Sequence, residues 1–436
     1  MAACQQRTGP DPGHDDVTEP PPKALTKPSK AQIAEVLRAH AWYRGSRPGG
    51  RRAILIDCDL AGVPLAGQDL SHADLTGSSF YGSDLRGCRF DSATVFGCDF
   101  REANLENSSL VHADLRGCHF AGANLAGANL FEADMREGMQ ITRDRQGEFH
   151  VRGPEDKPTA ASGANFSGAN LTNAHLAGVV AVQTDFSDAI MRGCKLTRAH
   201  VRGANFSGCD LEGADFSQAD TRDACFRGAI LLRASFDYAN IAGADLVDAL
   251  SDKPHGRLVS ELGVTVDELL RRHQQFILSG GVSGSLLELS GFDLRGTIGL
   301  TGVCLTMAKA SKAVFFGLDL SRAALQAAKC PDSDFRNARL DQADMRGINL
   351  VGARLNNASM RKADLRALQM ENGRRMAADL SRARLRYADL RDAQLGGACL
   401  AGADLSFADL TGANLTGTDL TGATLAGTVG GPPARP

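Results

Sequence analysis

Apolar side chains recur at every fifth position along most of this chain. Residues 113–130 read ADLRGCHFAGANLAGANL and residues 403–420 read ADLSFADLTGANLTGTDL, so the shared unit is A-[D/N]-L-x-G. The central Leu, Phe or Met residues form three runs, from Leu60 to Met135, from Phe166 to Leu246 and from Leu300 to Leu425. An internal repeat this short predicts a solenoid rather than several globular domains.

The period of five excludes the two common regular elements. Successive steps of five residues rotate by about 140° on an α-helix and would spread the apolar side chains over every face. A strand alternates with a period of two. A five-residue unit can instead form one side of a coil, with the central apolar residue and the residue two before it pointing inward. Four such sides would close a turn of about 20 residues.

These A-[D/N]-L-x-G units resemble those of the pentapeptide-repeat family, over roughly residues 50–140, 160–250 and 285–428. The resemblance implies an all-β solenoid, a right-handed quadrilateral β-helix. Its coils would stack at about 4.8 Å, the spacing of neighbouring strands. A square interior holds one medium and one small residue per side. This matches a chain with 43% hydrophobic residues but only one Trp and four Tyr.

Two short helices are predicted beside the repeats. Ser29 and Gln32 form a capping-box pattern, and the apolar residues that follow predict an amphipathic helix over residues 30–44. A second helix is predicted over residues 265–278. The segment AEVLRAHAWY (34–43) aligns with DELLRRHQQF (267–276), which places His40 opposite His273. We therefore expect a duplication, with a β-helix in two blocks, each preceded by a short capping α-helix that covers an exposed sheet edge.

The domain organisation follows from these elements. We expect a disordered Pro-rich tail over 1–28, a cap helix and lead-in over 29–52, and a first β-helix over 53–250 with an inserted loop at 136–163. A linker and second cap helix at 251–288, a second β-helix at 289–428 and a disordered tail at 429–436 complete the chain. The inserted loop is predicted to form a hairpin near Arg145, and either binds a partner or is a neutral insertion.

No catalytic motif stands out, so an enzyme is not expected and neither is a cofactor or a metal. There is no Walker loop, no dinucleotide-binding fingerprint and no HExxH. Six of the eleven cysteines fall two residues before a repeat centre, where small side chains point inward: Cys58, Cys88, Cys98, Cys118, Cys194 and Cys209. They are interpreted as interior residues in a reducing compartment.

Neither a membrane span nor a secretory signal is predicted. No apolar run reaches the roughly 18 residues that a span needs. The segment MAACQQRTGPDPGHDD has no apolar stretch typical of a signal peptide. We expect a cytoplasmic protein of bacterial type.

Charge is distributed unevenly between the blocks. Residues 53–135 carry 12 acidic and 4 basic side chains, whereas residues 309–391 are net basic. Asp74, Asp114 and Asp134 are predicted to share one face, with Thr94 interrupting them. The basic candidates for partner binding are Arg322, Arg339, Arg361, Lys362 and Arg382. The alternative is a solvated surface with local ion pairs that contribute little.

The leading functional hypothesis is a non-enzymatic protein-interaction scaffold with an unknown protein partner. The family resemblance implies a second hypothesis, a mimic of B-form DNA that binds DNA gyrase or topoisomerase through the acidic N-terminal block. A third is contact with nucleic acid or an anionic surface through the basic C-terminal block. The C-terminal coils lack a predicted cap helix, so an end-to-end homodimer through residues 400–425 is also expected.

Overall fold

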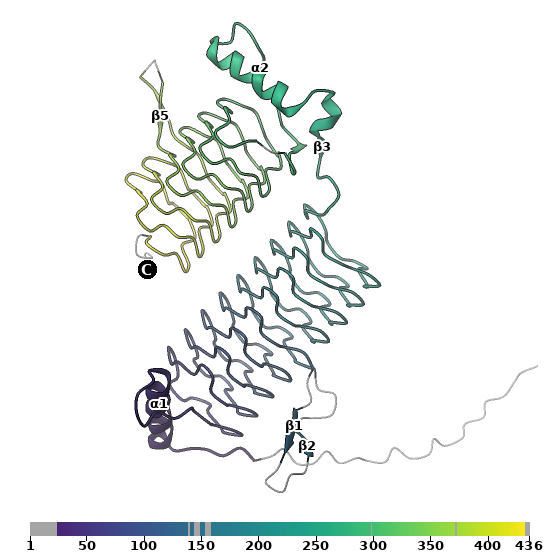
Figure 1. The fold of residues 1–436 in the computed structure, drawn as a ribbon, viewed down its shortest axis with the longest axis vertical. Helices are drawn as coiled ribbons and strands as arrows, with labels where there is room; N and C mark the ends of the chain where they lie inside the picture. The colour runs from purple at the N-terminus through teal and green to yellow at the C-terminus, as the bar shows by residue number, and fades with distance from the viewer. Residues whose placement is uncertain are drawn as a thin grey trace, which may run out of the picture. The chain divides into compact units, whose positions relative to one another are not determined.

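The computed structural model describes residues 24–137, 140–143, 149–152, 158–297, 299–370 and 373–431. The chain divides into two compact units, with the boundary between Ala249 and Leu250. Each unit consists of a short helix followed by a stack of coils (Figure 1).

Each coil contains four five-residue sides, and each side pairs with the side twenty residues later. Asp59 pairs in parallel with Ser79, which pairs with Asp99 in the next coil. The Leu60 N–H donates to the Ser79 carbonyl at 2.9 Å, and the Ser79 N–H donates to the Cys58 carbonyl at 2.9 Å. One residue per side forms the bridge, so the repeats contain ladders of single bridges rather than long strands. The parallel bridges between residues twenty positions apart agree with the predicted coil of four five-residue sides.

The inward positions form the core of each unit. We number the centre of a side 0, so the inward residues occupy positions 0 and −2, the bridge residue −1, and the corner +2. Leu115 and Phe120 are completely buried, as the five-residue pattern predicts. Phe80, Phe100 and Phe120 stack with centroid separations of 5.0 and 5.2 Å. Parallel rings fit because this separation is close to the distance between adjacent coils.

The outward residues at position −1 and the corner residues at +2 set the backbone direction. The Asp59 carboxylate accepts the Ala61 N–H at 3.1 Å, and Asn104 accepts the Glu106 N–H in the same way. The corner residue adopts a positive φ, for example 68° at Gly117 and 56° at Asn107. Gly and Asn tolerate this conformation better than other residues, which explains the Gly after many repeat centres.

Both units begin with a capping helix. Helix α1 (Lys30–Arg44) is capped by Ser29, which accepts the Gln32 N–H while the Gln32 side chain accepts the Ser29 N–H. Helix α2 (Val266–Leu278) follows Thr265, whose hydroxyl accepts the Glu268 N–H at 3.2 Å. Ile33, Val36 and Leu37 of α1 pack against the first core, and Val266, Leu269 and Leu270 of α2 pack against the second.

An extended segment precedes each helix and pairs with the first coil. Thr26 bridges Cys58, although the sequence placed residues 1–28 in a disordered tail. In the second unit β3 (Arg257–Leu258) pairs in parallel with β4 (Phe292–Asp293). The short 3₁₀ helix η1 (Val259–Leu262) then leads towards α2. We call residues 24–52 the first cap and residues 257–286 the second cap; the duplication includes this extended segment as well as the helix.

Two hairpins interrupt the coils without breaking the ladders. Strands β1 (Gln140–Arg143) and β2 (Phe149–Arg152) pair antiparallel, which confirms the predicted hairpin pairing. The first insertion is shorter than 136–163, because buried Thr159 already occupies position −2 of the next side. The tip around Arg145 lies outside the described residues. The second hairpin joins β5 (Leu368–Gln369) to β6 (Arg375–Met376).

Both units end in coils that no described helix covers. In the first unit Ile241 and Leu246 are 48% and 46% exposed. In the second unit Leu415, Leu420 and Leu425 are only half-buried. Val429 bridges Asp409 and so belongs to the last coil, whereas the sequence placed residues 429–436 in a disordered tail.

Removing one ring from a phenylalanine column tests the packing of the core. Phe186 is fully buried and stacks on Phe206 at 5.0 Å. We expect Phe186→Ala to lower the free energy of unfolding by about 3–5 kcal/mol, because it leaves a cavity that the neighbouring coils cannot close. The control is Tyr238→Ala, since Tyr238 is 92% exposed and its loss should cost less than about 0.5 kcal/mol. Equal urea midpoints for the two variants would contradict this picture.

Candidate functional surfaces

The structure places the three acidic candidates of the first unit in one column. Bridges run from Asp74 to Thr94, from Thr94 to Asp114 and from Asp114 to Asp134. All four residues occupy position −1 of the same side in successive coils. The sequence therefore predicted the alignment of this column correctly, including its interruption by Thr94.

The same column is not a bare acidic surface. Arg116 Nε lies 2.8 Å from Asp114 and 3.8 Å from Asp134, and Arg136 Nη2 lies 2.7 Å from Asp134. Arg52 lies 3.5 Å from Asp74. Burial by itself would raise the pKa of Asp134, but the hydrogen bonds from Arg136 outweigh it and lower the pKa below its usual value. Each of the three carboxylates in this column therefore has a guanidinium beside it.

This pairing is a recurring motif with Asp at position −1 and Arg at +1 of one side. The backbone N–H and Nε of the Arg both donate to Oδ1 of the Asp, and Nη2 donates to Oδ2. The pairs are 84/86, 99/101, 114/116, 134/136, 220/222, 293/295, 334/336, 344/346, 364/366 and 389/391. Such forked contacts fix the guanidinium plane. Charge totals concealed the motif, although Asp-x-Arg around a repeat centre is readable in the sequence.

Several of these pairs are extended by contacts between coils. Arg346 Nε lies 3.9 Å from Asp364 of the next coil, and Arg391 Nε lies 3.6 Å from Asp409. Positive and negative groups thus alternate parallel to the axis of the coils. Exposed pairs of this kind contribute little to stability, about 0–1 kcal/mol each. Their main effect is to hold side chains of both signs in fixed positions on the surface.

The structure separates the basic candidates into two groups. Four of them lie on the same side of successive coils, the side that contains the bridges from Asp319 to Arg339 and from Arg339 to Ser359. These four are Arg322, Arg339, Arg361 and Lys362. Arg382 follows Asp379, which bridges Asn349 on a different side. The sequence therefore grouped Arg382 with residues that do not share its side.

The basic candidates also differ in their ion pairs. Arg339 lies 3.5 Å from Asp319, and Arg361 lies 3.0 Å from Asp341. Arg322, Lys362 and Arg382 are exposed and form no ion pair with any residue in the described part of the chain. These three side chains are the free cations among the predicted set.

The buried cysteines point inward, as predicted, and most also donate hydrogen bonds. Cys88 Sγ lies 2.7 Å from the Leu65 carbonyl, and Cys118 Sγ lies 2.9 Å from the Val95 carbonyl. Ser78 uses its hydroxyl in the same way towards Leu55. Burial raises the pKa of Cys88 to about 11 and that of Cys330 to about 12. These thiols are therefore structural groups rather than nucleophiles.

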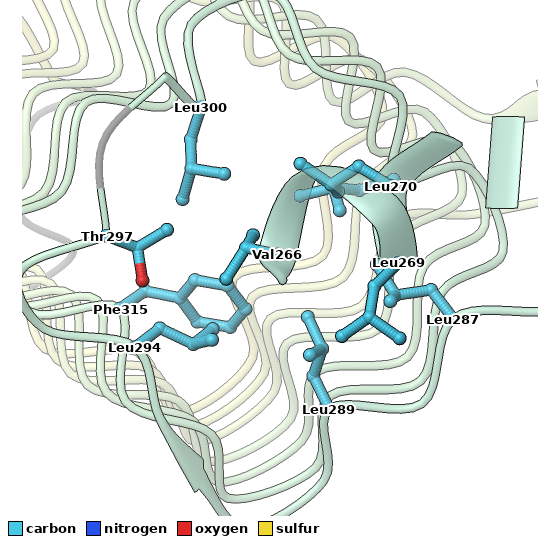
Figure 2. Close-up of a pocket in the computed structure, with 10 residues that line it drawn as sticks. Val266, Leu269, Leu270, Leu287, Leu289, Leu294, Thr297, Leu300 and Phe315 are labelled. Atoms are coloured by element: carbon cyan, nitrogen blue, oxygen red, sulfur yellow. The ribbon is translucent and has the colours of Figure 1, made fainter. Parts of the chain in front are cut away.

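The apolar space beneath α2 offers little room for chemistry. Figure 2 shows Val266 of α2 near Phe315, and Leu269 near Leu289. With Leu270 these side chains line an apolar space of about 10 Å³. That volume is about one water molecule, and an apolar site of this size stays dry. This contact between α2 and the first coil is thus packed and leaves no room for a ligand.

An open cleft of about 400 Å³ lies between η1, the start of α2 and the first coil. It contains Asp293 and Arg295, which are paired at 2.6 Å. The Arg295 guanidinium also donates to the carbonyls of Ser251 and Lys253, so its hydrogen bonds hold the linker against the coil. Within the described ranges no cluster of three metal-ligating side chains occurs, and no helix is long and apolar enough to cross a membrane.

Thiol accessibility provides a test of this assignment. We expect iodoacetamide at about pH 8 to alkylate the half-buried Cys225, Cys304 and Cys399 in the native protein. Cys88 and Cys330 should remain unmodified until urea is added, because the thiolate form is disfavoured inside the core. Peptide mass spectrometry would measure each fraction. Rapid alkylation of Cys88 without denaturant would show that the coils open in the native state.

Known structures with similar coils include pentapeptide-repeat proteins. HetL, involved in heterocyst differentiation regulation in the cyanobacterium Nostoc sp. strain PCC 7120, is 20% identical over 90% of this chain and 96% of its own, with a TM-score of 0.20. QnrB1, a plasmid-mediated fluoroquinolone resistance protein, is 22% identical over 46% of this chain and 91% of its own, with a TM-score of 0.24. Scores this low carry no argument about function. No curated protein matches the chain.

The repeats themselves establish the relationship. The family profile for pentapeptide repeats matches residues 53–91, 98–136, 162–250, 319–367 and 377–427. These ranges contain most of the ladders, inward columns and Asp-x-Arg pairs described above, and they cover more than half of the chain. The chain belongs to the pentapeptide-repeat family.

Proposed function

We propose that the protein is a non-enzymatic protein-interaction scaffold, in which each unit is a right-handed quadrilateral β-helix. The main supporting observation is the fixed outer surface, where Asp-x-Arg pairs hold charged groups of both signs in register along the coils. The interior is filled by stacked side chains, and in the cleft beside η1 Asp293 and Arg295 are paired with each other while Arg295 also binds carbonyls of the linker. These features favour recognition over catalysis.

Preformed surface groups explain how such a scaffold would bind. Arg116 and Arg346 are held by their own Asp neighbours before any partner arrives. Binding then costs less side-chain entropy than it would on a flexible surface. Alternating charges also select a partner with the complementary pattern, because a misaligned partner would place like charges together. Specificity is therefore expected to come from position along the coils rather than from net charge.

A capture experiment with two deletions tests the scaffold. Joining Glu137 to Thr159, or Ala367 to Ala378, removes one hairpin and restores the five-residue phase. We expect the protein to capture a protein partner from its native cell. We expect both deletion variants to retain capture, because the proposed contact surface lies on the coils and not on either hairpin. If no protein is retained above a bait-free control, the scaffold proposal is wrong; loss of capture in the 138–158 deletion alone would assign binding to the first hairpin.

The gyrase hypothesis receives less support from the site geometry. A DNA mimic needs a continuous row of unpaired negative charges, whereas Asp114 and Asp134 are each paired with an Arg. We expect the protein to leave gyrase supercoiling unchanged at about 10 μM, a concentration at which ordinary specific complexes form. Inhibition that disappears in the triple variant Asp74→Asn, Asp114→Asn, Asp134→Asn would reverse this conclusion.

Contact with nucleic acid or an anionic surface would depend on Arg322, Lys362 and Arg382. Their exposure and lack of ion pairs favour such contact, but Arg382 lies on a different side from the other two. A salt-dependent affinity for a labelled oligonucleotide, lost in Arg322→Ala, Lys362→Ala, would support this alternative over the scaffold.

We also propose the end-to-end homodimer through residues 400–425. Within the described ranges the backbone N–H groups of Leu415, Leu420 and Leu425 make no backbone hydrogen bond, and their side chains are only half-buried. A second copy would cover both the edge and the apolar centres. Light scattering at tens of micromolar should report a dimer that Leu420→Asp converts to a monomer. A strict monomer for the unaltered chain would exclude it.

A further inference from the structure

Each cap is joined to its first coil by a completely buried histidine. His40 of α1 accepts the Ala53 N–H at Nδ1 at 3.0 Å, and His273 of α2 accepts the Leu287 N–H at Nδ1 at 3.1 Å. Both donors occupy position −2 of the first side in their unit. Both imidazoles are 0% exposed. The same hydrogen bond between a cap histidine and the first coil therefore occurs in both units.

The hydrogen bond defines the protonation state of each ring. An Nδ1 atom that accepts a backbone N–H carries no proton, so the imidazole is neutral with its proton on Nε2. Adding a proton from solvent to Nδ1 of His40 would set two donors, Nδ1–H and the Ala53 N–H, against each other. The hydrogen bond would break, and a positive charge would be left in a buried site.

The groups that face the two rings act in both directions, and burial leaves the neutral form favoured. Burial lowers the pKa of His40; the Asp69 carboxylate and the Ser71 carbonyl raise it, whereas Arg44 and His72 lower it further. Burial also lowers the pKa of His273, opposed only by the carbonyl of Thr306. Ser71 and Thr306 hold equivalent places, at position +1 of the fourth side of the first coil. Each ring is thus enclosed between the two ends of one coil.

We propose that His40 and His273 are acid-sensitive latches that release the two caps from the first coils when the pH falls. Release would uncover the sheet edge and the apolar centres of each first coil. The sign follows from linkage. Since both pKa values are lowered in the folded state, the unlatched form binds protons first, and the latch is stable above the ordinary histidine value near 6.5. Its stability declines as the pH falls below that value.

The single tryptophan provides a local reporter for the first cap. Trp42 lies on α1, two residues from His40, and its ring packs against Gly49. We expect its fluorescence to change reversibly between about pH 6.5 and about pH 5, before global unfolding. In His40→Asn the amide oxygen can still accept the Ala53 N–H but cannot titrate, so this transition should vanish. His273→Asn, the matched control in the other unit, should keep it.

Two further measurements keep the test decisive. His72→Gln removes the other nearby imidazole, which belongs to the first coil itself, and should leave the transition in place because the bond from the Ala53 N–H to His40 is unchanged. If His40→Asn does not fold at neutral pH, amide hydrogen exchange measured on the unaltered protein takes the place of the fluorescence test on this variant. Protection of the amides of Ala53 and Leu287, corrected for intrinsic rates, should then fall at least tenfold from pH 7 to pH 5. Unchanged protection, or a Trp42 transition that persists in folded His40→Asn, would overturn the proposal.

Discussion

The hydrogen-bonded ladder between coils is the constraint on which the rest of this structure depends. Because each side pairs with the side twenty residues later, the separation of successive inward side chains is set by the backbone. The Phe80–Phe100–Phe120 column satisfies that separation with stacked rings at 5.0 and 5.2 Å. A small residue at position −2 completes each side. The composition of the chain, poor in Trp and rich in Ala, follows from this narrow interior.

The five-residue period was sufficient to predict the coil and its inward columns, whereas the cap helices were predicted from capping-box patterns and helical spacing. It was sufficient because position in the repeat decides whether a side chain points in or out, as for Leu115. The pairing of Thr26 with Cys58 was missed, since one bridge leaves no pattern in a Pro-rich segment. The Arg partners of Asp114 and Asp134 were missed because charges were summed over blocks. The sequence thus predicted that the Asp side chains align in one column, but their pairing with Arg side chains became visible only in the structure.

The outer surface has consequences for how function is assigned in this family of folds. A stretch with many carboxylates can still present an almost balanced field when each Asp is followed two residues later by an Arg. The Asp389–Arg391–Asp409 series shows this balance extending from one coil to the next. Net charge alone therefore says little about the partner. The positions of the unpaired cations Arg322, Lys362 and Arg382 carry more information.

The corners that admit the two hairpins show how this architecture accepts foreign sequence. His119 still bridges Ala160, and Asn349 still bridges Asp379, although extra residues intervene in both cases. The intervening chain enters and leaves at neighbouring points, so the ladder above and below is undisturbed. A lineage, or a protein engineer, could exchange such an insert for another peptide without redesigning the column. New binding segments could then be gained by insertion at the corners, while the coils that support them stay the same.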